Sequence, residues 1–130
     1  MTERILLIED NENNRYLVTF LLEAAGYEVV QAGDGPSGVA LAARLQPALV
    51  LLDIQLPGMD GYAVARALKA DAATAALPIV AVTSHAMAGD RGAALAAGCR
   101  GYLTKPIDPD TFVATVRRHL QGDFGGAEAS

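Results

Sequence analysis

The stretch LVLLDIQLPGMDGY, from Leu49 to Tyr62, decides the fold because it joins an apolar run to a charge. Four apolar residues, Leu49–Leu52, predict a buried strand, and they lead directly into the carboxylate of Asp53. A proline and two glycines follow and predict a loop. A charge at the end of a buried strand costs free energy unless its surroundings use it, so Asp53 is a candidate functional residue.

The composition predicts one globular domain. The chain has 130 residues, 52% of them hydrophobic, which is enough apolar material for a core and excludes a disordered chain. It carries 10 Lys and Arg against 15 Asp and Glu, for a net charge of −5. Because a phosphate backbone needs a basic surface, nucleic acid is not expected as a primary partner.

The cysteine count and the first residues predict a cytoplasmic location. The single cysteine, Cys99, cannot form an intramolecular disulfide and suits a reducing compartment. The apolar run Ile5–Ile8 near the N-terminus is too short for a signal peptide. No apolar run approaches the length that spans a bilayer, so membrane insertion is not expected.

Short apolar runs alternate with helical patterns along the chain. The predicted strands are Ile5–Ile8, Glu28–Ala32, Leu49–Leu52, Ile79–Val82 and Tyr102–Leu103. The predicted helices are one over residues 17–25 that stops before Gly26, then Pro36–Leu45, Gly61–Lys69, Met87–Ala97, and one capped by Asp108 that reaches Leu120. This alternation predicts an α/β domain over residues 1–121 and a flexible tail over residues 122–130. The expected architecture is a doubly wound, five-stranded parallel sheet of flavodoxin-like order 2-1-3-4-5, with helices on both faces.

Polar residues follow the four strands that should lie nearest the topological switch point. Glu9 and Asp10 follow the first strand, Asp53 the third, Thr83 the fourth and Lys105 the fifth. Ligands of such sheets bind at the carboxyl ends of the strands, so these side chains should meet at one edge. We therefore expect three carboxylates, a hydroxyl and an ammonium group in one site.

This set of groups predicts phosphoryl transfer. Three adjacent carboxylates repel one another and raise a pKa unless cations offset them, and an all-oxygen site suits Mg²⁺. A carboxylate is already nucleophilic at neutral pH, so Asp53 could accept a phosphoryl group directly. Mg²⁺, Lys105 and the Thr83 hydroxyl would then stabilise the charge on the phosphoryl oxygens.

The chain resembles the receiver domain of two-component response regulators (CheY-like) from about Arg4 to Leu120. The matching stretches are Ile8–Asn11, Leu52–Gly61, Ala81–Ser84 and Tyr102–Pro106. Asn11–Arg15 and Ala86–Asp90 further resemble stand-alone regulators of the DivK type or the receivers of hybrid histidine kinases. One departure is Glu9, where the family often has Asp.

The resemblance implies a role for each matching residue. Asp53 would be the phosphoacceptor, and Thr83 and Lys105 would contact the phosphoryl group. Mg²⁺ would be held by Asp53 and the backbone carbonyl of Gln55, together with two acids, Glu9 and Asp10. Tyr102 would be the switch aromatic that moves inward with the Thr83 loop, and the Lys105–Pro106 peptide bond would be cis.

We therefore expect a single-domain response regulator, a signalling module rather than an enzyme, which assists only its own phosphorylation and dephosphorylation. Its partners would be a sensor histidine kinase or histidine phosphotransfer protein, and a downstream protein bound at the fourth helix, fifth strand and fifth helix. One alternative is a receiver module of a hybrid histidine kinase. Another is an aspartyl-phosphate hydrolase of the haloacid dehalogenase kind, although Gln55 stands where such an enzyme needs an acid. A flavin mononucleotide binder is a third, although the acidic loop at Glu9–Glu12 would repel its phosphate.

Overall fold

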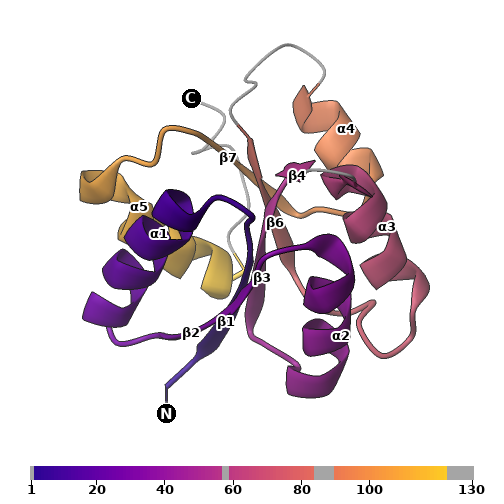
Figure 1. The fold of residues 1–130 in the computed structure, drawn as a ribbon, viewed down its shortest axis with the longest axis horizontal. Helices are drawn as coiled ribbons and strands as arrows, with labels where there is room; N and C mark the ends of the chain where they lie inside the picture. The colour runs from indigo at the N-terminus through magenta and orange to yellow at the C-terminus, as the bar shows by residue number, and fades with distance from the viewer. Residues whose placement is uncertain (1, 57–58, 84–89, 123–130) are drawn as a thin grey trace.

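Strands and helices alternate along the chain and form one sheet between two layers of helices (Figure 1). The computed structural model describes residues 2–56, 59–83 and 90–122. The strands of the main sheet are β1 (Arg4–Ile8), β2 (Glu28–Ala32), β3 (Leu49–Asp53), β6 (Ile79–Thr83) and β7 (Gly101–Thr104). The helices are α1 (Glu12–Ala24), α2 (Gly35–Leu45), α3 (Gly61–Ala70), α4 (Asp90–Ala96) and α5 (Pro109–Leu120).

The main sheet has five parallel strands in the order β2-β1-β3-β6-β7, which confirms the predicted order 2-1-3-4-5. The numbering skips because the short strands β4 (Gln55–Leu56) and β5 (Met59–Asp60), which the sequence did not predict, form a separate antiparallel pair. In register, Ile8 lies opposite Leu52, and Asp53 opposite Val82. The carboxyl ends of the neighbouring strands are therefore level, and the residues after them emerge at one edge.

The sheet is buried on both faces because alternate side chains of each strand point into different cores. Leu6 and Ile8 of β1 pack on the side of α2 and α3, whereas Ile5 and Leu7 pack on the side of α1 and α5. Figure 1 shows α1 and α5 together on one side of the sheet and α2, α3 and α4 on the other. The uninterrupted apolar runs of the strands are the consequence of this double coverage.

Polar side chains cap α1, α2, α3 and α5 and fix where each of these helices begins. The side chain of Asp108 accepts a hydrogen bond from the Asp110 backbone N–H at 3.0 Å, as its predicted capping role requires. Asn11, Asp34 and Asp60 cap α1, α2 and α3 in the same way, although the sequence analysis did not single them out. No helix in the described ranges is long and apolar enough to cross a membrane.

Every predicted strand and helix is present, but many of their boundaries differ, and the first helix begins at Glu12 instead of residue 17. The third strand includes Asp53, which was expected just after it, and α4 covers Asp90–Ala96 within the predicted helix Met87–Ala97. The start of that predicted helix, and residues 123–130 of the predicted tail, lie outside the described residues. Gly26, the expected stop of the first helix, has a φ of 97°, which a glycine adopts without strain.

Gly61 brings the start of α3 into contact with the backbone that follows Asp53. Its N–H donates to the Ile54 carbonyl at 3.0 Å. A Cβ added at Gly61 would lie 2.7 Å from the carbonyl oxygens of both Asp53 and Ile54, so the backbone itself would have to shift. Gly92, on the surface of α4, has no atom within 4 Å of the corresponding position.

Replacing Gly61 by alanine should therefore lower the free energy of unfolding by roughly 1–3 kcal/mol, the usual cost of overpacking. The matched variant Gly92→Ala should raise it by up to about 1 kcal/mol, because alanine favours an exposed helix position over glycine. Urea unfolding followed by circular dichroism measures both changes. Equal stability of Gly61→Ala and the unmodified protein would contradict the close approach.

Candidate functional site

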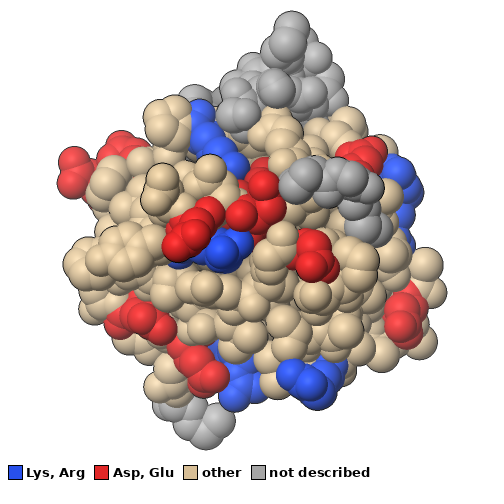
Figure 2. Space-filling view, in the orientation of Figure 1, with Lys and Arg blue, Asp and Glu red and all other residues tan. Residues whose placement is uncertain are grey.

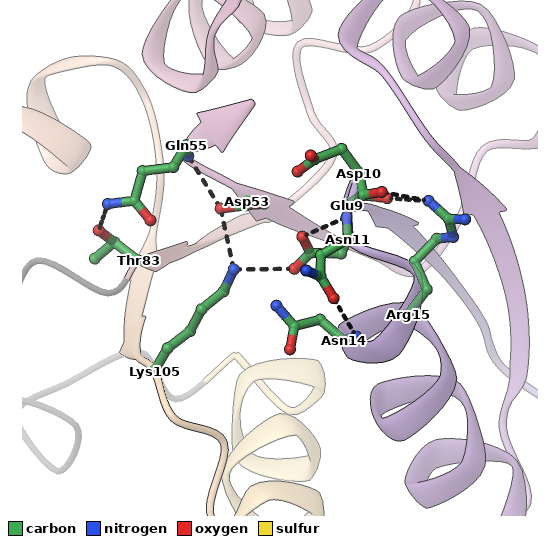
Figure 3. A network of polar contacts seen from close by, with 9 residues as sticks. All are labelled: Glu9, Asp10, Asn11, Asn14, Arg15, Asp53, Gln55, Thr83 and Lys105. Carbon is green, nitrogen blue, oxygen red and sulfur yellow. Dashed lines mark hydrogen bonds and ion pairs between the residues drawn. The ribbon is translucent and has the colours of Figure 1, made fainter. Parts of the chain in front are cut away.

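Three carboxylates meet where β1 and β3 end. Glu9 and Asp10 follow β1, Asp53 closes β3, and each offers an oxygen within 4.8 Å of the others. Figure 3 shows these side chains converging from the two strand ends. Acidic and basic groups lie next to one another near the middle of the molecular face in Figure 2. The structure thus brings together the three acids that the sequence selected.

Lys105 supplies a positive charge between two of these acids. Its ammonium nitrogen lies 3.1 Å from Oε1 of Glu9 and 3.4 Å from Oδ1 of Asp53. The residue follows β7, and its backbone N–H donates to the carbonyl of Thr83 at 2.7 Å, which ties it to the end of β6. The Lys105–Pro106 peptide bond is cis, as expected. Lys105 is therefore an integral part of the acidic site.

Asp53 and Thr83 are both almost completely buried, with relative exposures of 2% and 1%. Gln55 contacts both of them. Its backbone N–H donates to Oδ1 of Asp53, and its side-chain amide donates to Oγ1 of Thr83, each at 3.0 Å. The sequence analysis assigned only the carbonyl of Gln55 a role, so the side-chain contact is a structural finding.

Glu9 carries the clearest electrostatic signature of the site. Burial is the largest of the causes that raise the pKa of its carboxyl, followed by a hydrogen bond with Asp53 and the charge of Asp53, and the net result is a rise from 4.5 to about 7. The Asn11 backbone N–H, which donates to Oε2 at 3.2 Å, and the Lys105 ammonium lower this pKa but do not offset the rise. The neighbouring carboxylate contributes to the raised pKa of Glu9, as the crowding of acids predicted, but burial is the larger cause.

Arg15 is a member of this network that the sequence analysis missed. Its Nη1 donates to the carbonyl oxygens of Glu9 and Asp10 at 2.9 and 3.0 Å. The sequence signal was its position in the first turns of a helix that directly follows the acids. The side chain of Asn14, from the same helix, lines a small hollow beneath the site together with Asp53 and Lys105.

Tyr102, the predicted switch aromatic, lies apart from the acids. It is on β7 opposite Ala81 of β6, and its ring is in the core, with a relative exposure of 7%. Ser84, the last residue of the matching stretch Ala81–Ser84, lies outside the described residues. The structure therefore places five of the predicted side chains at one edge and Tyr102 beside them in the sheet.

The donor set fits a divalent cation. All the converging groups are carboxylate oxygens, which are the ligands that Mg²⁺ prefers, and one ammonium group leaves their charge incompletely offset. The raised pKa of Glu9 is the observation that supports this, because a proton takes up the negative charge when no metal does. The site is an acidic, cation-accepting pocket.

The metal-free protein should lose stability as the pH rises through neutrality. A carboxyl whose pKa is raised from 4.5 to about 7 by folding binds a proton more tightly in the folded state, so its contribution is full below pH 4.5 and is lost by about pH 7. We expect the loss to be on the order of 2 kcal/mol. Urea unfolding in EDTA from pH 5 to 8 measures it.

Glu9→Gln should remove this pH dependence, and the exposed neighbour Glu12→Gln should retain it. Hydrogen bonds from Ser37 lower the pKa of Asp34 from 3.8, and burial raises the pKa of the Cys99 thiol to about 11, so neither group titrates between pH 5 and 8. Identical pH profiles for Glu9→Gln and the unmodified protein would show that Glu9 is not the group responsible.

Known proteins share this sequence and this fold. The family model of the response regulator receiver domain matches residues 5–117. The protein PilH of Pseudomonas aeruginosa is 40% identical over 92% of this chain and 98% of its own length. The polar-differentiation response regulator DivK of Brucella ovis is 39% identical, again over 92% and 98%.

Two solved structures extend the comparison. The chemotaxis protein CheY4 of Vibrio cholerae superposes with a TM-score of 0.85 at 28% identity, covering 91% of this chain and 98% of its own. The receiver domain of a Pseudomonas aeruginosa sensor histidine kinase, with magnesium coordinated in its active-site cleft, gives a TM-score of 0.82 at 36% identity over 97% and 100%. With its fold, its acidic site and these matches in agreement, the chain belongs to the family of response regulator receiver domains of two-component signalling systems.

Proposed function

We propose that Asp53 accepts a phosphoryl group from the phosphohistidine of a sensor histidine kinase or a histidine phosphotransfer protein. The observation that carries the proposal is the position of its carboxylate, buried at the end of β3 with the Lys105 ammonium 3.4 Å away. A carboxylate so placed is fixed in orientation and has a cation beside it for the charge of an incoming group. The chain acts in signalling through the phosphorylated state and not by turnover of a substrate.

The transfer forms a bond between an Asp53 carboxylate oxygen and phosphorus while the bond from phosphorus to the imidazole nitrogen breaks. Lys105 then pairs with the phosphoryl oxygens in place of the bare carboxylate, and the Thr83 hydroxyl donates to one of them. Mg²⁺ held by Glu9, Asp10, Asp53 and the Gln55 carbonyl offsets the charge of the acids and the phosphoryl group. Water later releases phosphate from the same aspartate.

The arrangement disfavours the two other chemistries considered for this fold. A phosphatase of the haloacid dehalogenase kind needs a second carboxylate as acid and base two residues beyond the nucleophile. Gln55 stands there, and its amide donates to Thr83. A flavin phosphate would meet the carboxylates of Glu9 and Asp10, which would repel it. A receiver within a hybrid histidine kinase uses the same site chemistry and remains a form of the same proposal.

We place the downstream contact on the surface made by α4, β7 and α5, and the phosphodonor at the mouth of the acidic site. The donor must cover that mouth, where α1 starts. Tyr16 and Phe20 stack on the exposed face of α1 with ring centroids 6.4 Å apart, and they are 73% and 59% exposed. Exposed aromatic side chains often anchor protein contacts, which supports α1 as part of the donor surface.

Asp53→Asn should abolish phosphorylation by acetyl phosphate, because an amide oxygen is not a nucleophile of comparable strength. Intact-mass spectrometry after incubation with acetyl phosphate and Mg²⁺ should show one added phosphoryl group on the unmodified protein and on the control Glu12→Gln. Excess EDTA should suppress the reaction, since the uncompensated acids repel the anionic donor. A phosphorylated Asp53→Asn protein would refute the assignment.

Phosphorylation should shift a two-state surface over α4, β7 and α5. Thr83 ends β6 and pairs with Thr104 of β7, so a movement of the Thr83 hydroxyl toward a phosphoryl oxygen should shift the ends of both strands. With beryllofluoride and Mg²⁺, amide hydrogen exchange should change from Thr83 to Leu120, and partner affinity should shift by about 1–3 kcal/mol. Asp53→Asn is the control, and changes restricted to α1 and α2 would contradict this surface.

A further inference from the structure

Two consecutive residues, Glu9 and Asp10, direct their carboxylates to the same place. In an extended strand, adjacent side chains point to opposite faces, so they could not share one cation. Yet an oxygen of each lies within 4.8 Å of the other and of Asp53. β1 ends at Ile8 and α1 begins at Glu12, so both acids lie in the short turn that joins the strand to the helix, and something must stabilise that turn.

Arg15 makes the contacts that stabilise it. One nitrogen, Nη1, donates hydrogen bonds to the backbone carbonyl oxygens of both residues, at 2.9 Å for Glu9 and 3.0 Å for Asp10. In an extended strand, successive carbonyl groups point in opposite directions. Because the carbonyl groups of Glu9 and Asp10 both point to one nitrogen, the backbone turns between them. Both bonds go to carbonyl oxygens, so Arg15 itself occupies none of the carboxylate oxygens. Figure 3 shows the guanidinium behind the acids, on the side away from Lys105.

The helix holds the guanidinium in place. Arg15 lies in the first turns of α1, and its backbone N–H donates to the carbonyl of Asn11 at 3.0 Å. The side chain of Asn11 caps the same helix by accepting from the Asn14 N–H at 2.9 Å. Gly33 lies next to the guanidinium group, because a Cβ added at Gly33 would lie 3.5 Å from Nη1 of Arg15. The turn is thus fixed by a rigid element and not by a mobile surface chain.

We propose that Arg15 is a positioning residue for the metal, which sets the turn that aims Glu9 and Asp10 at one cation. The inference rests on the proposed function, because it concerns the metal of the same site. It adds a residue that contacts neither the metal nor the phosphoryl group. Outer groups that orient metal ligands commonly contribute 10–100-fold to metal affinity.

Whether replacement of Arg15 weakens or tightens Mg²⁺ binding distinguishes a positioning role from simple charge repulsion. A guanidinium near the acids repels a divalent cation, so loss of its charge alone would tighten Mg²⁺ binding. Loss of the turn would scatter the two carboxylates and weaken Mg²⁺ binding. Arg15→Gln removes the charge and the Nη1 donor together, whereas Arg15→Lys keeps the charge but ends its side chain one bond short of the Nη1 position.

The experiment is a calorimetric titration of the full chain with Mg²⁺ alone, without phosphodonor, on the unmodified protein, Arg15→Gln, Arg15→Lys and the charge control Arg66→Gln. Arg66 is an exposed residue of α3. We expect about 10-fold weaker Mg²⁺ binding for Arg15→Gln and a smaller loss for Arg15→Lys. Arg66→Gln should bind Mg²⁺ as tightly as the unmodified protein, or slightly more tightly.

Thermal unfolding in EDTA accompanies each titration. If Arg15→Gln does not fold, Arg15→Lys decides: weaker Mg²⁺ binding at unchanged charge supports the positioning role, and unchanged binding overturns it. Equal or tighter binding by a folded Arg15→Gln overturns it as well. Failure of the unmodified protein to bind Mg²⁺ would overturn the proposed function together with this inference, whereas normal binding by all variants would overturn only the role of Arg15.

Discussion

One ammonium group stands between two buried carboxylates, and the rest of the site depends on this imbalance. Lys105 lies within 3.4 Å of both Glu9 and Asp53, yet a single positive charge cannot neutralise both acids and Asp10 as well. The remaining negative charge must be met by a proton or by a cation. The pKa of about 7 at Glu9 means that a proton can neutralise part of this charge, and the converging oxygens offer ligands to a cation that could neutralise it instead.

The sheet holds these incompletely neutralised groups together at one edge. Level strand ends place groups from four strands at one edge, and apolar packing on both faces prevents them from moving apart. Gln55 then links the groups, because its backbone binds Asp53 and its side chain binds Thr83. A change in the charge or position of the Asp53 carboxylate therefore has a short bonded route to Thr83 and β6. Such a contiguous route is a physical basis for coupling, provided that β6 and β7 have two stable arrangements.

The sequence was sufficient to predict the fold and the cluster of three acids, and the physical reasons can be stated. Apolar runs report buried strands, and the carboxyl-end rule turns their order into a site, so Glu9, Asp10 and Asp53 could be grouped without coordinates. The β4–β5 pair could not be predicted, because two-residue strands leave no periodic pattern. The bonds of Arg15 to two carbonyls were equally invisible, since backbone oxygens carry no sequence signal.

Tyr102 bears on how a signal could leave the site. Its ring is already buried in this state, packed in the core on the side of α3 and α4. A signal through this ring needs two arrangements, inward and outward, and a phosphoryl group shifts their balance only as far as it binds one arrangement more tightly. Gln55 enters that balance directly, because its bond to Thr83 favours the arrangement seen here, and a Thr83 hydroxyl drawn to a phosphoryl oxygen must change or share that bond.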